Sequence, residues 1–228
     1  MRGPVYNTTL DITNSHARLA ICLCLDTSSS MSGHPINSLN AGLRMFYNSL
    51  KKNTDSRRAA DIAIISFGAN GVQCMQNFAG LDRAPNPPSL SSEGMTPMGE
   101  AVNLALDMIE SRRNEYKNSG VQYYHPWLVI MSDGQPNGIA SEFERAVTRA
   151  AELERMNKLE TFAIGIGNDA DMRALSQFSP RRGAVSLVGL NFNGFFEWLS
   201  ISTQRISVSR PGDSINLPPI NNWGSINA

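Results

Sequence analysis

The sequence predicts an α/β protein with a doubly wound, mainly parallel central sheet, helices on both faces and one antiparallel edge strand. Short apolar runs alternate with segments of helical spacing, and one connection between two apolar runs is too short for a parallel crossover. The 228 residues, 41% of them hydrophobic, can bury the core of a single domain. We expect that domain to span residues 17–206, between an N-terminal extension, 1–16, and a Pro- and Asn-rich tail, 207–228.

The first part of the chain reads as strand, helix, strand and edge strand. Residues 19–25 form a continuous apolar run typical of a buried strand, and apolar side chains then recur at helical spacing over residues 36–50. Residues 62–67 form the second buried strand. Residues 72–78 follow after a connection of only a few residues, so we expect them to pair antiparallel with the second strand at the edge of the sheet.

The rest of the chain begins with a proline-rich loop and continues the alternation. Residues 80–95 contain three prolines and little periodicity, which indicates a loop. After the loop, the hydrophobic pattern predicts helices over residues 98–109, 143–153, 171–178 and 192–206, and strands over residues 127–131, 159–166 and 184–188. In the tail, we expect Ile220 and Trp223 to dock on the chain's own surface, because an exposed Trp favours aggregation.

Five side chains that carry oxygen, at three separate places, are predicted to form one metal site. Asp26, Ser28 and Ser30 form an Asp-x-Ser-x-Ser run directly after the first strand. Thr96 stands in the loop ahead of a predicted helix, and Asp133 directly follows another buried strand. In open α/β sheets, ligands bind at the carboxyl ends of the strands, so all three segments can reach the same edge.

The types of these side chains indicate which ion the site would take. Hydroxyls and carboxylates are hard oxygen donors, and none of the five residues is His or Cys, which favours Mg²⁺, Mn²⁺ or Ca²⁺ over Zn²⁺ or Cu²⁺. Mg²⁺ takes about six oxygen ligands. Two carboxylates and three neutral hydroxyls leave the ion short of ligands and of negative charge, so the site is expected to attract a carboxylate from outside.

The five positions resemble the metal-ion-dependent adhesion site of von Willebrand factor type A domains, and the resemblance extends over residues 17–206. It implies a Rossmann-like fold and a bound Mg²⁺ or Mn²⁺. The three hydroxyls would bond the ion directly, and the two carboxylates would act directly or through water. The resemblance also implies that the metal captures an acidic side chain of a partner protein, with Thr96 bonding the ion in the competent state.

Residues 96–101 and the compact layout look most like the TerY-type proteins of bacterial tellurite-resistance and stress loci. This narrower resemblance implies a scaffold that acts alongside a PP2C-like phosphatase and a protein kinase. Ser29 departs from the pattern, since bacterial members often have Gly there, but the position is not a metal ligand. We expect Glu100 to take no part in the site.

The same residues allow other interpretations. Asp26 and the serines after it could be a helix N-cap, and Asp133–Gly134 an ordinary turn, although three such elements in this order favour a site. Asp26 could instead be the phosphoacceptor of a Mg²⁺-dependent aspartyl-phosphate enzyme or receiver. However, Ser28 stands where such an enzyme has a second carboxylate, and no Lys follows the strand at 159–166.

Two further enzyme classes lack their motifs. Residues 165–170 have the Gly-x-Gly-x-x-Ala spacing of a phosphate loop, but no acidic residue follows at the distance that dinucleotide binding requires. No Gly-x-Ser-x-Gly elbow supports a serine hydrolase. The sequence therefore favours a binding module over an enzyme.

Composition favours a cytoplasmic protein that binds neither nucleic acid nor a membrane. Lys plus Arg and Asp plus Glu number 20 each, so no overall charge attracts nucleic acid or an anionic membrane. The first residues lack the apolar segment of a secretory signal, and no run reaches the ~20 apolar residues of a membrane span. Cys22 and Cys24 lie two apart in a predicted strand and are expected to be buried, reduced thiols on one face.

Overall fold

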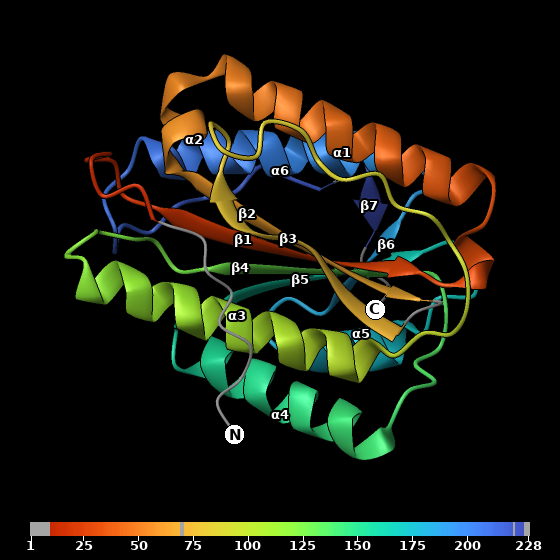
Figure 1. The fold of residues 1–228 in the computed structure, drawn as a ribbon. Helices are drawn as coiled ribbons and strands as arrows, with labels where there is room; N and C mark the ends of the chain where they lie inside the picture. The colour runs from red at the N-terminus through yellow and green to blue at the C-terminus, as the bar shows by residue number, and fades with distance from the viewer. Residues whose placement is uncertain (1–9, 69–70, 221, 226–228) are drawn as a thin grey trace.

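A computed structural model describes residues 10–68, 71–220 and 222–225. The first nine residues of the expected N-terminal extension, the last three of the tail and the middle of the connection at 68–71 lie outside the described residues. A seven-stranded sheet lies between two layers of helices, which confirms the predicted α/β architecture (Figure 1).

The order of strands across the sheet is β3-β2-β1-β4-β5-β6-β7. Strands β2, β1, β4, β5 and β6 run parallel to one another. The predicted edge strand β3 pairs antiparallel with β2, as expected. The strands are β1 (Leu19–Thr27), β2 (Ala60–Gly68), β3 (Gly71–Gly80), β4 (Trp127–Ser132), β5 (Glu160–Ile166), β6 (Ala184–Leu187) and β7 (Gly224–Ser225).

Helices cover both faces of the sheet, α1, α2 and α6 on one face and α3, α4 and α5 on the other (Figure 1). The sequence pattern missed two short elements, α2 and the 3₁₀ turn η1, because neither is long enough to show helical periodicity. The helical elements are η1 (Ser29–Met31), α1 (His34–Lys52), α2 (Thr54–Ala59), α3 (Met98–Asn118), α4 (Ala140–Arg155), α5 (Met172–Phe178) and α6 (Phe192–Ser207).

The central strand β1 is buried on both faces, which explains its continuous apolar sequence. Its side chains alternate between the two halves of the core: Leu23 and Leu25 pack in the cluster that includes α1 and α6. Cys22 and Cys24 pack in the cluster that includes α3 and are fully buried, as expected for core thiols. On the first face, α1 and α6 approach so closely that a side chain at Gly42 would collide with the ring of Phe196.

The tail docks on the domain, as the sequence predicted for Trp223. This side chain is 2% exposed and packs against the rings of Phe195 and Trp198. The indole of Trp198 donates a hydrogen bond to Pro218 O at 2.8 Å. Strand β7 then pairs antiparallel with β6, so the tail adds a second antiparallel edge strand that the sequence did not predict.

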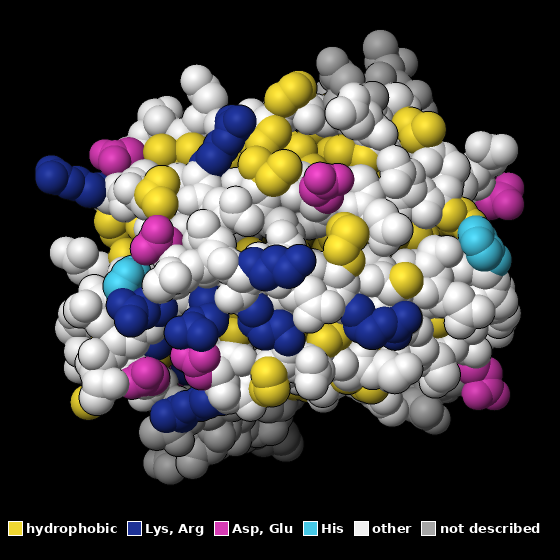
Figure 2. Space-filling view, turned by 90° about the horizontal axis from the view of Figure 1, so that it is seen from above, with side chains coloured by type: hydrophobic (Ala, Val, Ile, Leu, Met, Phe, Trp, Pro, Cys, Tyr) yellow, Lys and Arg dark blue, Asp and Glu magenta, His cyan; other side chains and the backbone are white. Residues whose placement is uncertain are grey.

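The balanced overall charge is unevenly distributed over the surface. Figure 2 shows the face that α1 and α2 help to form, where Lys and Arg side chains gather in a band. Arg44, Lys52, Arg57 and Arg58, which lie on these two helices, are exposed. Among the described residues, no helix combines the length and hydropathy that a membrane span requires.

The chain reverses direction across the sheet between β1 and β4. From β1 it builds outward through β2 and β3, and it then returns to add β4 on the other side of β1. The loops after β1 and β4 therefore leave the sheet side by side, at the position where open α/β sheets bind ligands. The residues predicted to hold a metal lie on and beside these two loops.

Candidate metal centre

Asp26 lies near the carboxyl end of β1 and is fully buried. Its Oδ1 accepts a hydrogen bond from Ser28 N at 2.8 Å, and its Oδ2 accepts one from Ser132 Oγ at 2.5 Å. Ser28 is the N-cap residue of η1, but its side chain makes no capping hydrogen bond. The interpretation of the Asp-x-Ser-x-Ser run as only a helix cap is therefore wrong.

The serine hydroxyls connect this loop to the one that follows β4. Ser28 Oγ and Ser30 Oγ are 3.0 Å apart and share a hydrogen bond. Ser30 Oγ donates to Asp133 Oδ1 at 2.7 Å, which joins two residues that are 103 positions apart in the sequence. The structure thus brings three of the five predicted residues into direct contact, and Asp26 joins them through the backbone of Ser28.

Thr96 approaches the same edge from the loop before α3 and is 4% exposed. Thr96 N donates to Asn137 Oδ1 at 2.6 Å, and Asn137 N donates to Thr96 O at 3.1 Å. A side chain at Gly134 would place its Cβ 3.9 Å from Thr96 Oγ1, so the Thr96 hydroxyl faces the residue next to Asp133. All five predicted residues therefore lie at one edge of the sheet.

A second pair of contacts ties the Thr96 loop to the loop after β1. Ser29 N donates to Gly94 O at 3.0 Å, and Gly94 N donates to Ser29 Oγ at 2.8 Å. Glu93 N also donates to Thr27 O at 2.8 Å. Ser29 is thus the residue that connects the Asp-x-Ser-x-Ser loop to the segment preceding Thr96.

The carboxylates of the site are short of positive charge. Burial and, to a smaller extent, the charge of Asp133 raise the pKa of Asp26 to about 6, although the hydrogen bonds from Ser132 and Ser28 lower it. Burial also raises the pKa of Asp133, as does the charge of Asp169. Carboxylates whose pKa is raised by burial and by a nearby negative charge are stabilised in their charged form by a cation beside them.

Sequence reasoning missed three residues that shape this site. Ser132 is fully buried and holds Asp26, and Asn137 holds Thr96. Asp169 lies in the loop after β5, in the segment considered above as a dinucleotide motif. For Ser132, a polar residue at the end of an otherwise apolar strand, directly before Asp133, was a usable signal. The roles of Asn137 and Asp169 depend on how the loops pack, and no local sequence pattern predicts them.

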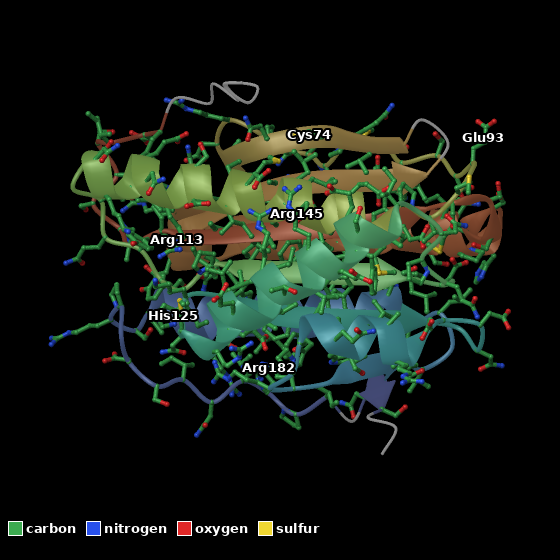
Figure 3. The ribbon with its side chains drawn as sticks, turned by 90° about the horizontal axis from the view of Figure 1, so that it is seen from below. Cys74, Glu93, Arg113, His125, Arg145 and Arg182 are labelled. Carbon is green, nitrogen blue, oxygen red and sulfur yellow. The ribbon has the colours of Figure 1, made fainter. Side chains whose placement is uncertain are left out.

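The candidate metal site lies at one end of the sheet, and different charged residues lie at the opposite end. Glu93 lies at the end where the loops after β1 and β4 meet, whereas Arg113 and His125 lie toward the opposite end (Figure 3). Glu93 is exposed and adds negative charge at the margin of the site.

The donor set fits a hard divalent cation. Three neutral hydroxyls and two carboxylates converge from three segments, and every donor is oxygen, as Mg²⁺ and Mn²⁺ prefer. The hydroxyls of Ser28 and Ser30 would bond the ion, Thr96 would supply the third hydroxyl, and Asp26 and Asp133 would supply the charge.

Comparison with known proteins identifies related chains. Residues 20–191 match the von Willebrand factor type A domain. No curated protein matches the chain by sequence.

Solved structures with the same fold include a von Willebrand factor type A protein from Catenulispora acidiphila, with a TM-score of 0.63 and 14% identity over 83% of this chain and 43% of that one. The vWF domain of the type V pili tip protein Mfa5 from Porphyromonas gingivalis has a TM-score of 0.59 and 12% identity, over 87% of this chain and 99% of that one. Manganese-loaded TRAP protein from Plasmodium vivax has a TM-score of 0.51 and 18% identity, over 81% of this chain and 73% of that one. The chain thus spans less than half of the Catenulispora protein, and at these identities the likeness concerns the fold.

Proposed function

Because this chain belongs to the von Willebrand factor type A domain family, we propose that it is a protein-binding module that depends on Mg²⁺ or Mn²⁺. The observation that carries the proposal is the hydrogen-bond chain from Ser28 through Ser30 to Asp133, which gathers hard oxygen donors from two separate loops. A related fold, the TRAP protein from Plasmodium vivax, is described as manganese-loaded, so Mn²⁺ is a suitable first ion to test.

Each residue of the site has a distinct task in this proposal. Ser28, Ser30 and Thr96 hold the ion with uncharged oxygens, while the fully buried Asp26 and the half-buried Asp133 balance its charge. The bound ion supplies an electrophilic position for a carboxylate. Because the three hydroxyls add no negative charge, an acidic side chain from a partner completes the site.

Apolar side chains beside the site favour a protein partner over a small anion. Met95 is 62% exposed and directly precedes Thr96, and Ile139 is 60% exposed and follows Asn137 by two residues. Since the hydrogen bonds between Thr96 and Asn137 hold their two loops together, both apolar residues lie near the donors. Apolar contacts of this kind add affinity when a partner's surface covers them.

We further propose the narrower setting that residues 96–101 suggest by their resemblance to TerY-type proteins. In that setting the chain is a cytoplasmic scaffold in a bacterial stress or tellurite-response system. A PP2C-like phosphatase and a protein kinase encoded nearby are then the first partners to test. This part of the proposal rests on sequence resemblance alone.

A binding role without catalysis is also the proposal that best suits Asp26. Both of its carboxylate oxygens accept hydrogen bonds and the side chain is fully buried, so it is poorly placed to attack a phosphoryl group. Purified protein should hydrolyse neither ATP nor aryl phosphates above background, and beryllofluoride should leave Asp26 unmodified. Metal-dependent turnover that is lost in Asp26→Asn would instead favour the aspartyl-phosphate enzyme.

Two measurements test the proposed function. Calorimetric titration should show that the parent binds Mn²⁺ and Mg²⁺, that Asp26→Ala does not, and that Zn²⁺ has no special preference for the site. Immobilised chain should then retain the candidate phosphatase or kinase in Mg²⁺ and release it in EDTA. Absence of heat with both Mn²⁺ and Mg²⁺ would overturn the metal site, and retention that persists in EDTA would overturn capture through the metal.

A further inference from the structure

The segment that follows Thr96 has a structural role at every position. Pro97 is the N-cap residue of α3, and Met98 is fully buried in the core. A side chain at Gly99 would place its Cβ 2.5 Å from the backbone of Phe143, so this glycine allows the first turns of α3 and α4 to touch. Glu100 is the next residue, and its side chain does not face the metal donors.

Glu100 instead reaches across to the start of α4. Its Oε1 accepts a hydrogen bond from Ile139 N at 2.8 Å. Ile139 is the N-cap residue of α4, and its aliphatic side chain cannot accept a hydrogen bond from the helix. Glu100 thus places a carboxylate at the N-terminus of α4, which has no capping side chain of its own. The helix dipole favours negative charge at this position.

The first turn of α3 leaves Glu100 free for this contact. A glutamate at the third helical position commonly bonds back to the N–H of the N-cap residue. Here the N-cap residue is Pro97, which has no N–H. The carboxylate therefore has no such donor on its own helix and bonds Ile139 instead.

Gly138 makes room for the carboxylate. A Cβ at this position would collide with both oxygens of Glu100. Glu100 Oε2 is buried and has no hydrogen-bond partner among the described residues, so packing against Gly138 rather than a second bond fixes the carboxylate there. A larger residue at 138 would displace the carboxylate from Ile139.

These contacts close a ring that begins and ends at Thr96. Four residues after Thr96, Glu100 holds Ile139, and two residues before Ile139, Asn137 holds Thr96 by two hydrogen bonds. The loop between β4 and α4 is thus fixed at one point by Glu100 and in turn fixes the backbone of Thr96.

We propose that Glu100 is a positioning residue for the metal site, which sets the place of the Thr96 hydroxyl through Ile139 and Asn137. The inference rests on the proposed function and assigns Glu100 no bond to the ion. It replaces the expectation, drawn from the sequence, that Glu100 takes no part in the site. Residues that orient metal ligands in this way typically change metal affinity when they are replaced.

Mn²⁺ titration of four variants tests the role of Glu100. Glu100→Ala and Gly138→Ala should each weaken Mn²⁺ binding by about 10-fold. Glu100→Gln keeps an acceptor for Ile139 N and should restore most of the affinity. Glu110→Ala, an exposed acidic residue on the same helix, is the matched control and should bind like the parent.

Amide hydrogen exchange in the metal-free protein gives a readout that does not depend on the ion. In Glu100→Ala and Gly138→Ala, the amides of Ile139 and Thr96 should exchange faster, while the core of β1 keeps its protection. Unchanged exchange at Thr96 together with parent-like Mn²⁺ affinity would overturn the inference. If the parent itself fails to bind Mn²⁺, the proposed function falls, and faster exchange at Thr96 still supports the ring of contacts. Should Glu100→Ala fail to fold, Gly138→Ala and Glu100→Gln carry the test.

Discussion

Ser29 and Gly94 exchange two hydrogen bonds, one between backbone atoms and one from Gly94 N to Ser29 Oγ. The residue between the two serine donors therefore holds the loop that precedes Thr96. Together with the contacts of Asn137, this pair fixes the Thr96 loop from both sides, so the hydroxyl is positioned before any ion arrives.

Ser29→Ala should weaken Mn²⁺ binding without abolishing it. The substitution removes the acceptor for Gly94 N but leaves every proposed ligand in place, and one hydrogen bond contributes about 1 kcal/mol, or about a fivefold change in affinity. Calorimetric titration checks this, with Ser91→Ala, an exposed serine of the same loop, as control. Equal affinity in the two variants would mean that the loop is held without the Ser29 hydroxyl.

Protonation of Asp26 at acidic pH should weaken metal binding and should stabilise the metal-free protein. With its pKa raised by burial to about 6, the folded state binds this proton more tightly than the unfolded chain does. Burying the charged carboxylate of Asp26 therefore lowers the free energy of unfolding. This loss is absent below the ordinary pKa of about 3.9 and complete above about 6, so the metal-free protein becomes less stable as the pH rises. Bound Mn²⁺ requires the charged carboxylate, which reverses the trend.

Comparison with Asp26→Asn isolates this effect from other titrating groups. Without metal, the variant should be more stable than the parent at pH 7, by up to about 3 kcal/mol, and the difference should shrink toward pH 4. Mn²⁺ should raise the melting temperature of the parent more at pH 7 than at pH 5, and that of Asp26→Asn at neither. A pH-independent difference between parent and variant would contradict the raised pKa.

Thr96→Ala should leave the domain folded and abolish capture of the partner. The change removes one hydroxyl from a loop whose backbone hydrogen bonds to Asn137 remain, so the cost in stability should be small. Capture should fail because the ion loses a ligand from the loop that meets the incoming carboxylate. Paired pull-down and circular dichroism measurements check this, with the exposed Thr148→Ala as control. Parent-like capture by a folded Thr96→Ala would show that the partner binds elsewhere.

Trp223→Ala should destabilise the domain without changing Mn²⁺ affinity. The indole packs on the rings of Phe195 and Trp198, far in the sheet order from β1, and removing a buried Trp costs about 3–5 kcal/mol. Val208→Ala, at a position that is 69% exposed, should stay within about 0.5 kcal/mol of the parent in chemical denaturation. A loss of Mn²⁺ affinity in folded Trp223→Ala would instead link the tail to the site.

The sequence predicted most of the strands and helices because buried elements have apolar residues at regular spacing along the chain. The continuous apolar run of β1 and the short connection before β3 were sufficient for the parallel core and its antiparallel edge. Strand β7 escaped prediction because two residues carry no period, and its pairing depends on Trp223 anchoring the tail.

The candidate site also has a part that the sequence predicted and a part that it did not. Asp26, Ser28, Ser30 and Asp133 could be placed at one edge because they follow strand ends, and Thr96 because it precedes a predicted helix. The contacts that orient Thr96, from Asn137 and Glu100, depend on how loops distant in sequence pack together. The order of residue types along the chain does not show which distant loops touch. These roles could therefore be recognised only in the structure.

The bond between Asp26 and Ser132 joins residues 106 positions apart and exists only where β1 lies beside β4. A partly folded chain that has not yet paired these two strands therefore offers an ion no more than scattered hydroxyls and carboxylates. An ion bound at this seam would stabilise contacts that exist only once β1 and β4 are paired. Contacts that form after the folding transition state slow unfolding rather than speed folding. The lifetime of the native domain, more than its rate of formation, would then follow the supply of divalent ions around it.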